Sequence, residues 1–237
     1  MKNKLTISDG VRLEGKISLD GAKNSALKLL AASLLTSGRV SLRNYPAGLL
    51  DTQVHVEMLR VLGKTVSVGD DQSVEILEVG SLETELKYDD RSIRNTLLIL
   101  GTLLTRRGHG KVPLPGGCKL GDRKYDLHVM LLERLGARVW DEGDFLCAEA
   151  PRGGLVGTDI QLPLRSTGAT ENAILCGTLA KGVTRVWNPH IRPEILDLVA
   201  MLRGMGAKIR VFGQEHIEIT GVEGLHGTDH RVIADNM

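Results

Sequence analysis

Hydrophobic positions repeat at helical spacing in two stretches of the chain, residues 24–35 and 93–104. In both stretches the apolar residues cover more than half of the expected helix surface, so a helix there would be buried between other elements. The spacing therefore predicts two internal helices. The positions that define them are Leu27, Leu29, Leu30, Leu34 and Leu35 in the first stretch, and Leu97, Leu98, Leu100, Leu103 and Leu104 in the second.

Near the end of the chain the pattern changes to strict alternation. Residues 208–212 and 216–219 alternate polar with apolar side chains, which predicts two strands with one face exposed to solvent. The intervening Gly213-Gln214-Glu215 predicts a hairpin turn. Three glycines that each follow a second helix are natural left-handed caps. They are Gly63, Gly136 and Gly206.

These elements recur three times in the same order: helix, strand, helix, then a strand pair. Val40, Val112 and Val186 stand at intervals of 72 and 74 residues, and the capping glycines stand at intervals of 73 and 70 residues. The fold class that this predicts is α/β (α+β), with three pseudo-symmetric units, buried helices and outer sheets. The units span about residues 23–90, 91–163 and 164–229.

Both ends of the chain lie outside this repeat. Residues 5–7 and 13–19 predict a strand pair before the first unit. Residues 231–235 form a strand-like apolar run near the end of the chain, with no visible partner in the sequence. Residues 1–22 and 230–237 are therefore expected to pair with something other than the three units.

Composition excludes several classes of function. The 237 residues carry a formal net charge of +1 and only 3% aromatic residues, which argues against nucleic-acid or anionic-membrane partners. The three cysteines are too widely spaced for a disulfide framework or a metal cluster, and no cofactor is expected. Neither a signal peptide nor a stretch of transmembrane length is visible, which predicts a cytoplasmic protein.

Candidate chemistry begins at the glycine-rich stretch 112–123. Gly116 and Gly117 allow a sharp turn that presents Cys118. Lys119 and Arg123 would favour the thiolate of Cys118 and attract an anion to the same place. A surface turn with an incidental cysteine explains the same residues.

The predicted starts of the three inner helices form a second candidate site. Lys23 and Asn24 stand at the first start, Arg94 at the second, and Ser166-Thr167-Gly168 at the third. In a pseudo-symmetric domain these helix starts would converge, and amide donors with cations would then form an anion site. Simple N-capping explains Asn24 equally well.

Asp126 and His128 could form an acid/base pair, but an N-cap role explains Asp126 as well. His128 and His190 are each expected to be packing or surface residues rather than ligands.

Five motifs in fixed order resemble the enolpyruvyl transferases, and they cover essentially the whole chain. The motifs are Gly21-Ala22-Lys23-Asn24-Ser25-Ala26-Leu27, Leu114-Pro115-Gly116-Gly117-Cys118, Gly121-Asp122-Arg123-Lys124-Tyr125-Asp126-Leu127-His128, Gly168-Ala169-Thr170-Glu171-Asn172 and Arg192-Pro193-Glu194-Ile195. The resemblance implies an inside-out α/β barrel domain of three βαβαββ units. It also implies transfer of the enolpyruvyl group of phosphoenolpyruvate to a hydroxyl of a uridine nucleotide sugar, without metal. The peptidoglycan branch of the family, whose acceptor is UDP-N-acetylglucosamine, resembles this chain most.

The resemblance implies a role for each matching residue. Lys23 and Arg123 would bind phosphate, and Cys118 would be the loop cysteine that assists catalysis and is alkylated by fosfomycin. The remaining residues would contact the substrates: Asn24 the acceptor, Arg94 the phosphate and nucleotide side of the cleft, Lys124, Asp126, Leu127 and His128 the uracil, and Ser166, Thr167 and Gly168 the diphosphate.

This chain departs from the family pattern in length and in charge. Family members are about twice as long, and the second domain supplies a catalytic aspartate and several arginines. Residues 1–22 and 230–237 would belong to that second domain, which another polypeptide could supply, and this chain alone is expected to be inactive. Leu164 stands where the peptidoglycan branch typically has lysine, and Ile191-Arg192-Pro193-Glu194 stands where that branch typically has Arg-Glu-Pro-Glu. A UMP-type transferase of nucleoside-antibiotic synthesis and a truncated, catalytically silent nucleotide-binding domain therefore stay open as alternatives.

Overall fold

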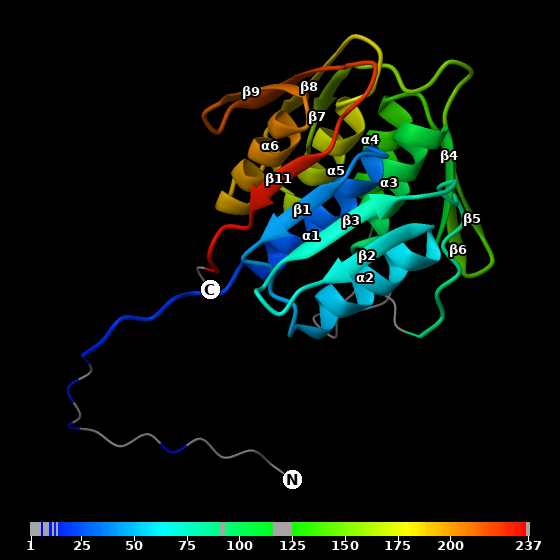
Figure 1. The fold of residues 1–237 in the computed structure, drawn as a ribbon. Helices are drawn as coiled ribbons and strands as arrows, with labels where there is room; N and C mark the ends of the chain where they lie inside the picture. The colour runs from blue at the N-terminus through cyan, green and yellow to red at the C-terminus, as the bar shows by residue number, and fades with distance from the viewer. Residues whose placement is uncertain are drawn as a thin grey trace.

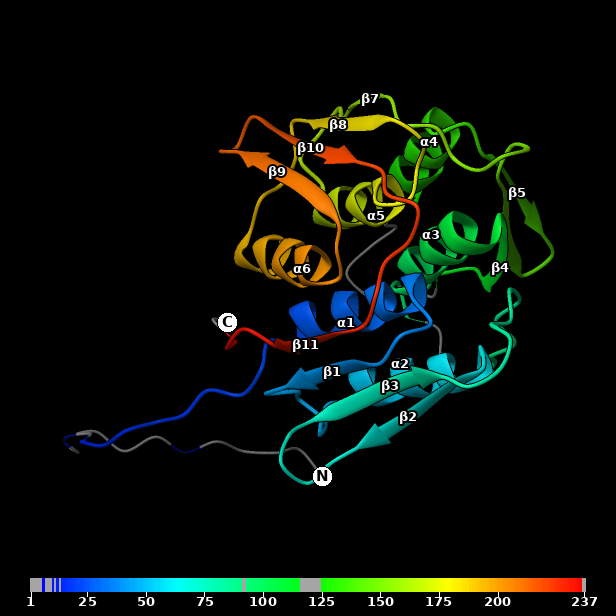
Figure 2. The ribbon, with the colours of Figure 1, turned by 45° about the horizontal axis from the view of Figure 1, so that its top comes forward.

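Three sheets surround a bundle of helices in the part of the chain that the computed structural model describes (Figure 1). The described residues are 14–90, 93–115 and 125–235, together with residues 6, 10 and 12. Figure 2 shows α1, α3 and α5 towards the middle, with strands of all three sheets on the outside. The predicted buried helices and outer sheets are confirmed. None of the described helices is both long and apolar enough to cross a membrane.

Each of the three units contains two helices and three strands in the predicted order. The first unit consists of α1 (Lys23–Ala32), the 3₁₀-helix η1 (Ser33–Leu35), β1 (Val40–Arg43), α2 (Leu50–Val61), β2 (Lys64–Val68) and β3 (Val74–Glu78). The second consists of α3 (Thr96–Arg107), β4 (His109–Pro113), α4 (Asp126–Arg134), β5 (Arg138–Glu142) and β6 (Phe145–Glu149). The third consists of α5 (Thr167–Gly177), β8 (Val183–Trp187), α6 (Pro193–Gly204), β9 (Lys208–Phe212) and β10 (His216–Thr220), while β7 (Asp159–Gln161) precedes it and β11 (Thr228–Arg231) follows it.

Local chemistry fixes the ends of these elements as the sequence predicts. The glycines after α2, α4 and α6 have φ angles of +93°, +94° and +99°, which residues other than glycine rarely adopt. Gly213 turns the hairpin between β9 and β10, where Ile217 pairs with Val211. The hairpin prediction and the three caps are confirmed.

A parallel strand from the preceding unit completes each sheet. β7 pairs in parallel with β8, and Glu85 forms a parallel bridge with Lys111 of β4. The first unit has no preceding unit, and the end of the chain takes this place, because β11 pairs in parallel with β1. The three units therefore close in a ring, with β11 as the closing strand.

The predicted ends of the domain need two corrections. The run at residues 231–235 does have a partner: Ile233 accepts a hydrogen bond from Ala22, and Asp235 donates one to Asp20, both at 2.8 Å. In addition, residues 14–20 form no strand, and Ile17 is 88% exposed. No described strand of this chain lies beside residues 14–20, so they have no ladder to join. Apart from Thr6, the first predicted strand at residues 5–7 lies outside the described residues.

The same ion-pair arrangement holds the parallel strand in all three sheets. A basic residue one position before Val40, Val112 and Val186 contacts one acid of the parallel strand and one acid of the antiparallel strands. The three sets are Arg39 with Asp229 (3.7 Å) and Glu75 (2.9 Å), Lys111 with Glu85 (3.6 Å) and Glu142 (2.6 Å), and Arg185 with Asp159 (3.7 Å) and Glu218 (3.0 Å). This recurrence extends the pseudo-symmetry from the backbone to the side chains.

Polar bonds also join each inner helix to the second helix of the preceding unit. The Asn95 amide lies 2.8 Å from His55 Nδ1, the Asn172 amide lies 3.1 Å from His128 Nδ1, and Ser25 donates to Asp197. Burial lowers the pKa of His55 to about 3. Burial, with a smaller contribution from the nearby Arg94, lowers the pKa of His128 to about 4. Both rings are therefore neutral packing residues at physiological pH, as expected for His128.

Candidate functional site

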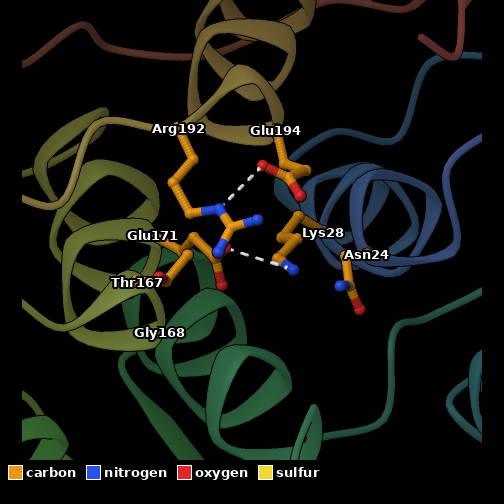
Figure 3. A pocket seen from close by; sticks show the side chains of 7 residues that line it. All are labelled: Asn24, Lys28, Thr167, Gly168, Glu171, Arg192 and Glu194. Atoms are coloured by element: carbon orange, nitrogen blue, oxygen red, sulfur yellow. Dashed lines mark ion pairs between the residues drawn. The ribbon is translucent and has the colours of Figure 1, made fainter. Parts of the chain in front are cut away.

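A cavity of about 200 Å³ lies where the starts of α1, α5 and α6 meet (Figure 3). Each of the three helices brings polar or charged side chains to its wall. The lining residues are Asn24 and Lys28 from α1, Thr167, Gly168 and Glu171 from α5, and Arg192 and Glu194 from the start of α6.

The N-terminus of α5 supplies hydrogen-bond donors to this cavity. Ser166 is the N-cap residue, and its hydroxyl accepts a bond from the Ala169 amide at 3.3 Å. The first amides of a helix have no partner within the helix, and the helix dipole adds partial positive charge at this end. Thr167 Oγ1 lies 2.8 Å from His190 Nδ1, which fixes the hydroxyl at the rim. An anion can therefore be bound at Thr167 and Gly168.

Gly168 is packed closely against the neighbouring unit. A Cβ at this position would lie 3.1 Å from His128 Nε2, which is tighter than ordinary contact. The absence of a side chain lets α5 approach α4 at the cavity. The His128 ring thus packs against the start of α5.

Two ion pairs border the cavity. Lys28 Nζ lies 3.2 Å from Glu171 Oε1, within hydrogen-bond distance, and Arg192 Nε lies 3.4 Å from Glu194 Oε2. Both carboxylates are buried, and Glu194 Oε2 accepts no hydrogen bond from any described group. Burial raises the pKa of Glu171 to about 7, against the opposing effect of Lys28. The cavity wall thus holds two cations, each beside a buried carboxylate.

The start of α1 differs from prediction in one respect. The N-cap is Ala22, so Asn24 lies in the first turn of the helix and caps nothing. Its amide faces the cavity instead. Lys23 does not line the cavity, and its Nζ lies 3.2 Å from Asp51 at the start of α2.

The second unit brings Arg94 and the start of α4 to the same end of the domain. Arg94 precedes α3 and is near enough to His128 to lower its pKa. Tyr125 is the N-cap of α4 and Asp126 is its first residue, so the alternative N-cap role for Asp126 does not hold. Asp126 is exposed, and Leu127 packs partly against the core.

Two of the three predicted helix starts meet, because Asn24 and Thr167 line one cavity. The start of α3 does not line it, but Asn95 beside Arg94 donates to the Leu27 carbonyl of α1 at 2.9 Å. The three remaining predicted site residues, Cys118, Arg123 and Lys124, lie outside the described residues. The substrate roles of all these residues stay predictions.

Four lining residues were absent from the predicted site: Lys28, Glu171, Arg192 and Glu194. For two of them the sequence carries a signal, because Lys28 follows Asn24 and Glu171 follows Thr167 by four positions. Residues four apart share one face of a helix, so a charged residue there lies next to the predicted ligand. No group of three or more potential metal ligands occurs within the residues that the structure describes.

Comparison with known proteins gives consistent results. A family model described as EPSP synthase (3-phosphoshikimate 1-carboxyvinyltransferase) matches residues 7–237. Two relatives named UDP-N-acetylglucosamine 1-carboxyvinyltransferase, from Maricaulis maris and Gluconacetobacter diazotrophicus, are 44% and 46% identical over 99% of this chain. The alignments cover 56% of each relative, so the chain spans about half the length of the curated relatives it matches.

Solved structures share the fold. The enolpyruvyl transferase NikO from Streptomyces tendae superposes with a TM-score of 0.80 at 24% identity, over 95% of this chain and 53% of NikO. An EPSP synthase from Acinetobacter baumannii gives a TM-score of 0.72 at 21% identity, over 93% of this chain and 50% of that enzyme. These similarities show the architecture of the domain.

Proposed function

Because the chain belongs to the EPSP synthase (3-phosphoshikimate 1-carboxyvinyltransferase) family, we propose that it forms one half of an enolpyruvyl transferase. The proposed reaction transfers the enolpyruvyl group of phosphoenolpyruvate to a hydroxyl of UDP-N-acetylglucosamine and releases phosphate. The identity of 41–46% to relatives named for this acceptor supports the choice of substrate. The cavity is the single observation that carries the proposal, because it places Asn24 beside the donor end of α5.

The chemistry needs cations and donors more than it needs a nucleophile on the protein. The acceptor hydroxyl loses its proton and its oxygen bonds to C2 of phosphoenolpyruvate, while C3 takes up a proton. The C2–O bond to phosphate then breaks and C3 loses a proton, which restores the double bond and releases phosphate. Groups that stabilise the phosphate charge accelerate both steps. Lys23, Arg94 and Arg123 are assigned to this task.

The remaining assignments follow from the motifs and from the cavity. Asn24 and the α5 start (Ser166, Thr167 and Gly168) would hold the acceptor and its diphosphate. The segment of Lys124, Asp126, Leu127 and His128 would frame the uracil, with buried His128 acting through packing. Cys118 would close over phosphoenolpyruvate and assist proton transfer or product release.

A second acceptor is favoured by one observation. Leu164, which stands where the peptidoglycan branch typically has lysine, is 57% exposed and uncharged. UMP is therefore the alternative acceptor, and binding of UMP with no binding of UDP-N-acetylglucosamine would favour it. The third candidate, a catalytically silent nucleotide-binding domain, predicts binding without any turnover even when the second half is supplied.

Phosphate release tests the function. This chain with phosphoenolpyruvate and UDP-N-acetylglucosamine should release no phosphate alone. It should release phosphate when the complementary half of a full-length relative is added. Release by the chain alone would show that the second domain is dispensable, and no release by the mixed halves would contradict the proposal.

Fosfomycin should alkylate Cys118 and neither of the other two cysteines. Burial raises the pKa of Cys147, and it raises the pKa of Cys176 to about 12, so both thiols are protonated and shielded. Cys118, between basic residues, should react as the thiolate. Mass spectrometry of peptides after treatment with fosfomycin and UDP-N-acetylglucosamine measures the result. Cys118→Ala should remove all labelling, and labelling at Cys147 or Cys176 instead would count against the assignment.

A further inference from the structure

The ion pairs at the cavity differ from the buried ion pair at the other end of α1. There, Lys64 Nζ lies 2.8 Å from Glu78 and donates to the Thr36 carbonyl at 2.6 Å, while Arg106 donates two bonds to the same Glu78 carboxylate. Every charged group in that cluster has aligned partners, as a purely structural ion pair requires. At the cavity, each carboxylate has one cation beside it, at the longer distances of 3.2 Å for Lys28 to Glu171 and 3.4 Å for Arg192 to Glu194. Lys28 and Arg192 are therefore held less tightly than the cations of the Glu78 cluster, and both lie beside the donor end of α5 in the same cavity.

Opposite charges face each other across the cavity wall. Lys28 and Arg192 contribute two positive charges, and Glu171 and Glu194 contribute up to two negative ones. An anion bound at the start of α5 would attract both cations and repel both carboxylates. The cavity can then restore neutrality if one carboxylate takes up a proton from solvent.

We propose that Lys28 and Arg192 determine the acceptor specificity of this site. They move away from the carboxylates of Glu171 and Glu194 and bind a phosphate group of the acceptor. Glu171 takes up a proton at the same time. The inference rests on the proposed function, because it assumes that the acceptor is a nucleotide held at this cavity. Lys28 and Arg192 would thus supply the positive charge that Leu164 does not provide.

The groups around Glu171 favour Glu171 as the proton acceptor. Lys28 faces it from α1, and Glu194 and Arg192 face it from the start of α6. On the α4 side, His128 lies against Gly168 and is neutral at physiological pH, with Arg94 beyond it. The strands behind α5 approach it at Gly177, nearer the other end of the helix, through Thr184 and Ile219, which do not titrate. Glu171 is thus the group whose charge responds most to the departure of Lys28.

The direction of the pH dependence follows from the pKa of Glu171, which is about 7 in the empty cavity. Departure of Lys28 and arrival of an anion both raise this pKa further. Binding therefore takes up protons above about pH 7, and affinity falls as the pH rises, by up to roughly tenfold per pH unit.

Calorimetry with UDP-N-acetylglucosamine tests the inference, because the diphosphate diester of this probe does not titrate near neutral pH. Titrations of the full chain in buffers of different ionisation enthalpy count the protons taken up. We expect up to about one proton per ligand and weaker binding at about pH 8 than at about pH 6. Glu171→Gln should take up no proton, and its affinity should not change with pH.

A double variant guards against misfolding, since Lys28→Met alone would leave a buried carboxylate without its cation. Lys28→Met/Glu171→Gln should bind roughly tenfold more weakly than Glu171→Gln, while the exposed Lys208→Met should bind like the parent. Binding by the parent without proton uptake, or equal affinity of the double variant and Glu171→Gln, overturns the inference and leaves the proposed function standing. No binding of the sugar nucleotide by the parent overturns both the inference and the proposed acceptor.

Discussion

Replacing Glu78 with glutamine should lower the free energy of unfolding by about 3–5 kcal/mol. Within the described residues, Glu78 is the only carboxylate that forms an ion pair with Lys64 and Arg106, and the replacement removes it. The Lys64 side chain is 1% exposed and that of Glu78 is 8% exposed, so solvent cannot replace the lost charge. Arg106 also donates to the carbonyls of Leu34 and Thr36 at the end of η1, so loss of Glu78 loosens the junction of α1 and α3. Urea unfolding followed by circular dichroism measures the change.

Glu75 provides a matched control on the same strand. Its side chain is 49% exposed and pairs with Arg39, so Glu75→Gln should cost less than about 1 kcal/mol. The pH dependence gives a further check. Burial would raise the pKa of Glu78, but hydrogen bonds from Arg106 and Lys64 outweigh it and hold the pKa below its ordinary value of 4.5. The stabilisation by Glu78 is therefore present above about pH 4.5 and is lost as the pH falls through the lowered pKa. Equal stability of both variants at neutral pH would contradict the role given to Glu78.

Removing residues 228–237 should prevent stable folding, because it deletes the closing strand β11. The deletion exposes the edge of β1 and removes Val232, which is 1% exposed and is worth about 1.5–3 kcal/mol when buried. It also takes two hydrogen-bonding groups from the buried carboxylate of Asp197: the His230 ring at 2.8 Å and the Ile233 amide at 3.4 Å. The total is on the order of 5 kcal/mol, which approaches the whole stability of a typical domain. Thermal unfolding and analytical gel filtration measure the loss.

Removal of residues 2–19 is the corresponding control at the other end of the chain. The described residues 14–19 are exposed and belong to no strand, so the melting temperature should change little. A shortened chain without residues 228–237 that melts cooperatively near the temperature of the parent would show that β11 does not close the domain.

The sequence predicts the helices at residues 24–35 and 93–104 and the hairpin at residues 208–219 because each of these elements carries its own periodicity, and the repeat supplies the other helices. It misplaces the closing strand because β11 (Thr-Asp-His-Arg) has no apolar alternation, and its partner lies 188 residues away along the chain. The apolar run at residues 231–235 predicts a strand, but the parallel ladder lies just before it. The pairing of β11 with β1 depends on how the three units close into a ring, and the strand propensity of the residues in β11 does not determine it.

Part of the candidate site can be predicted from the sequence, and part of it depends on the tertiary structure. Asn24 and the Ser166-Thr167-Gly168 start are visible because helix N-termini have a sequence signature. The pairing of Lys28 with Glu171 depends on how α1 packs beside α5, and α1 and α5 are separated by about 140 residues of sequence. Helical periodicity places each residue on the correct face, but only the tertiary structure brings the two faces together.

Hydrogen exchange with and without UDP-N-acetylglucosamine and phosphoenolpyruvate tests the central claim, that the acceptor binds at the convergence of the helix starts. We expect slower exchange in peptides covering residues 22–28 and 166–171, where first-turn amides lack helical partners, and no change in the β9–β10 hairpin. Unchanged exchange in both peptides at saturating ligand would contradict the account.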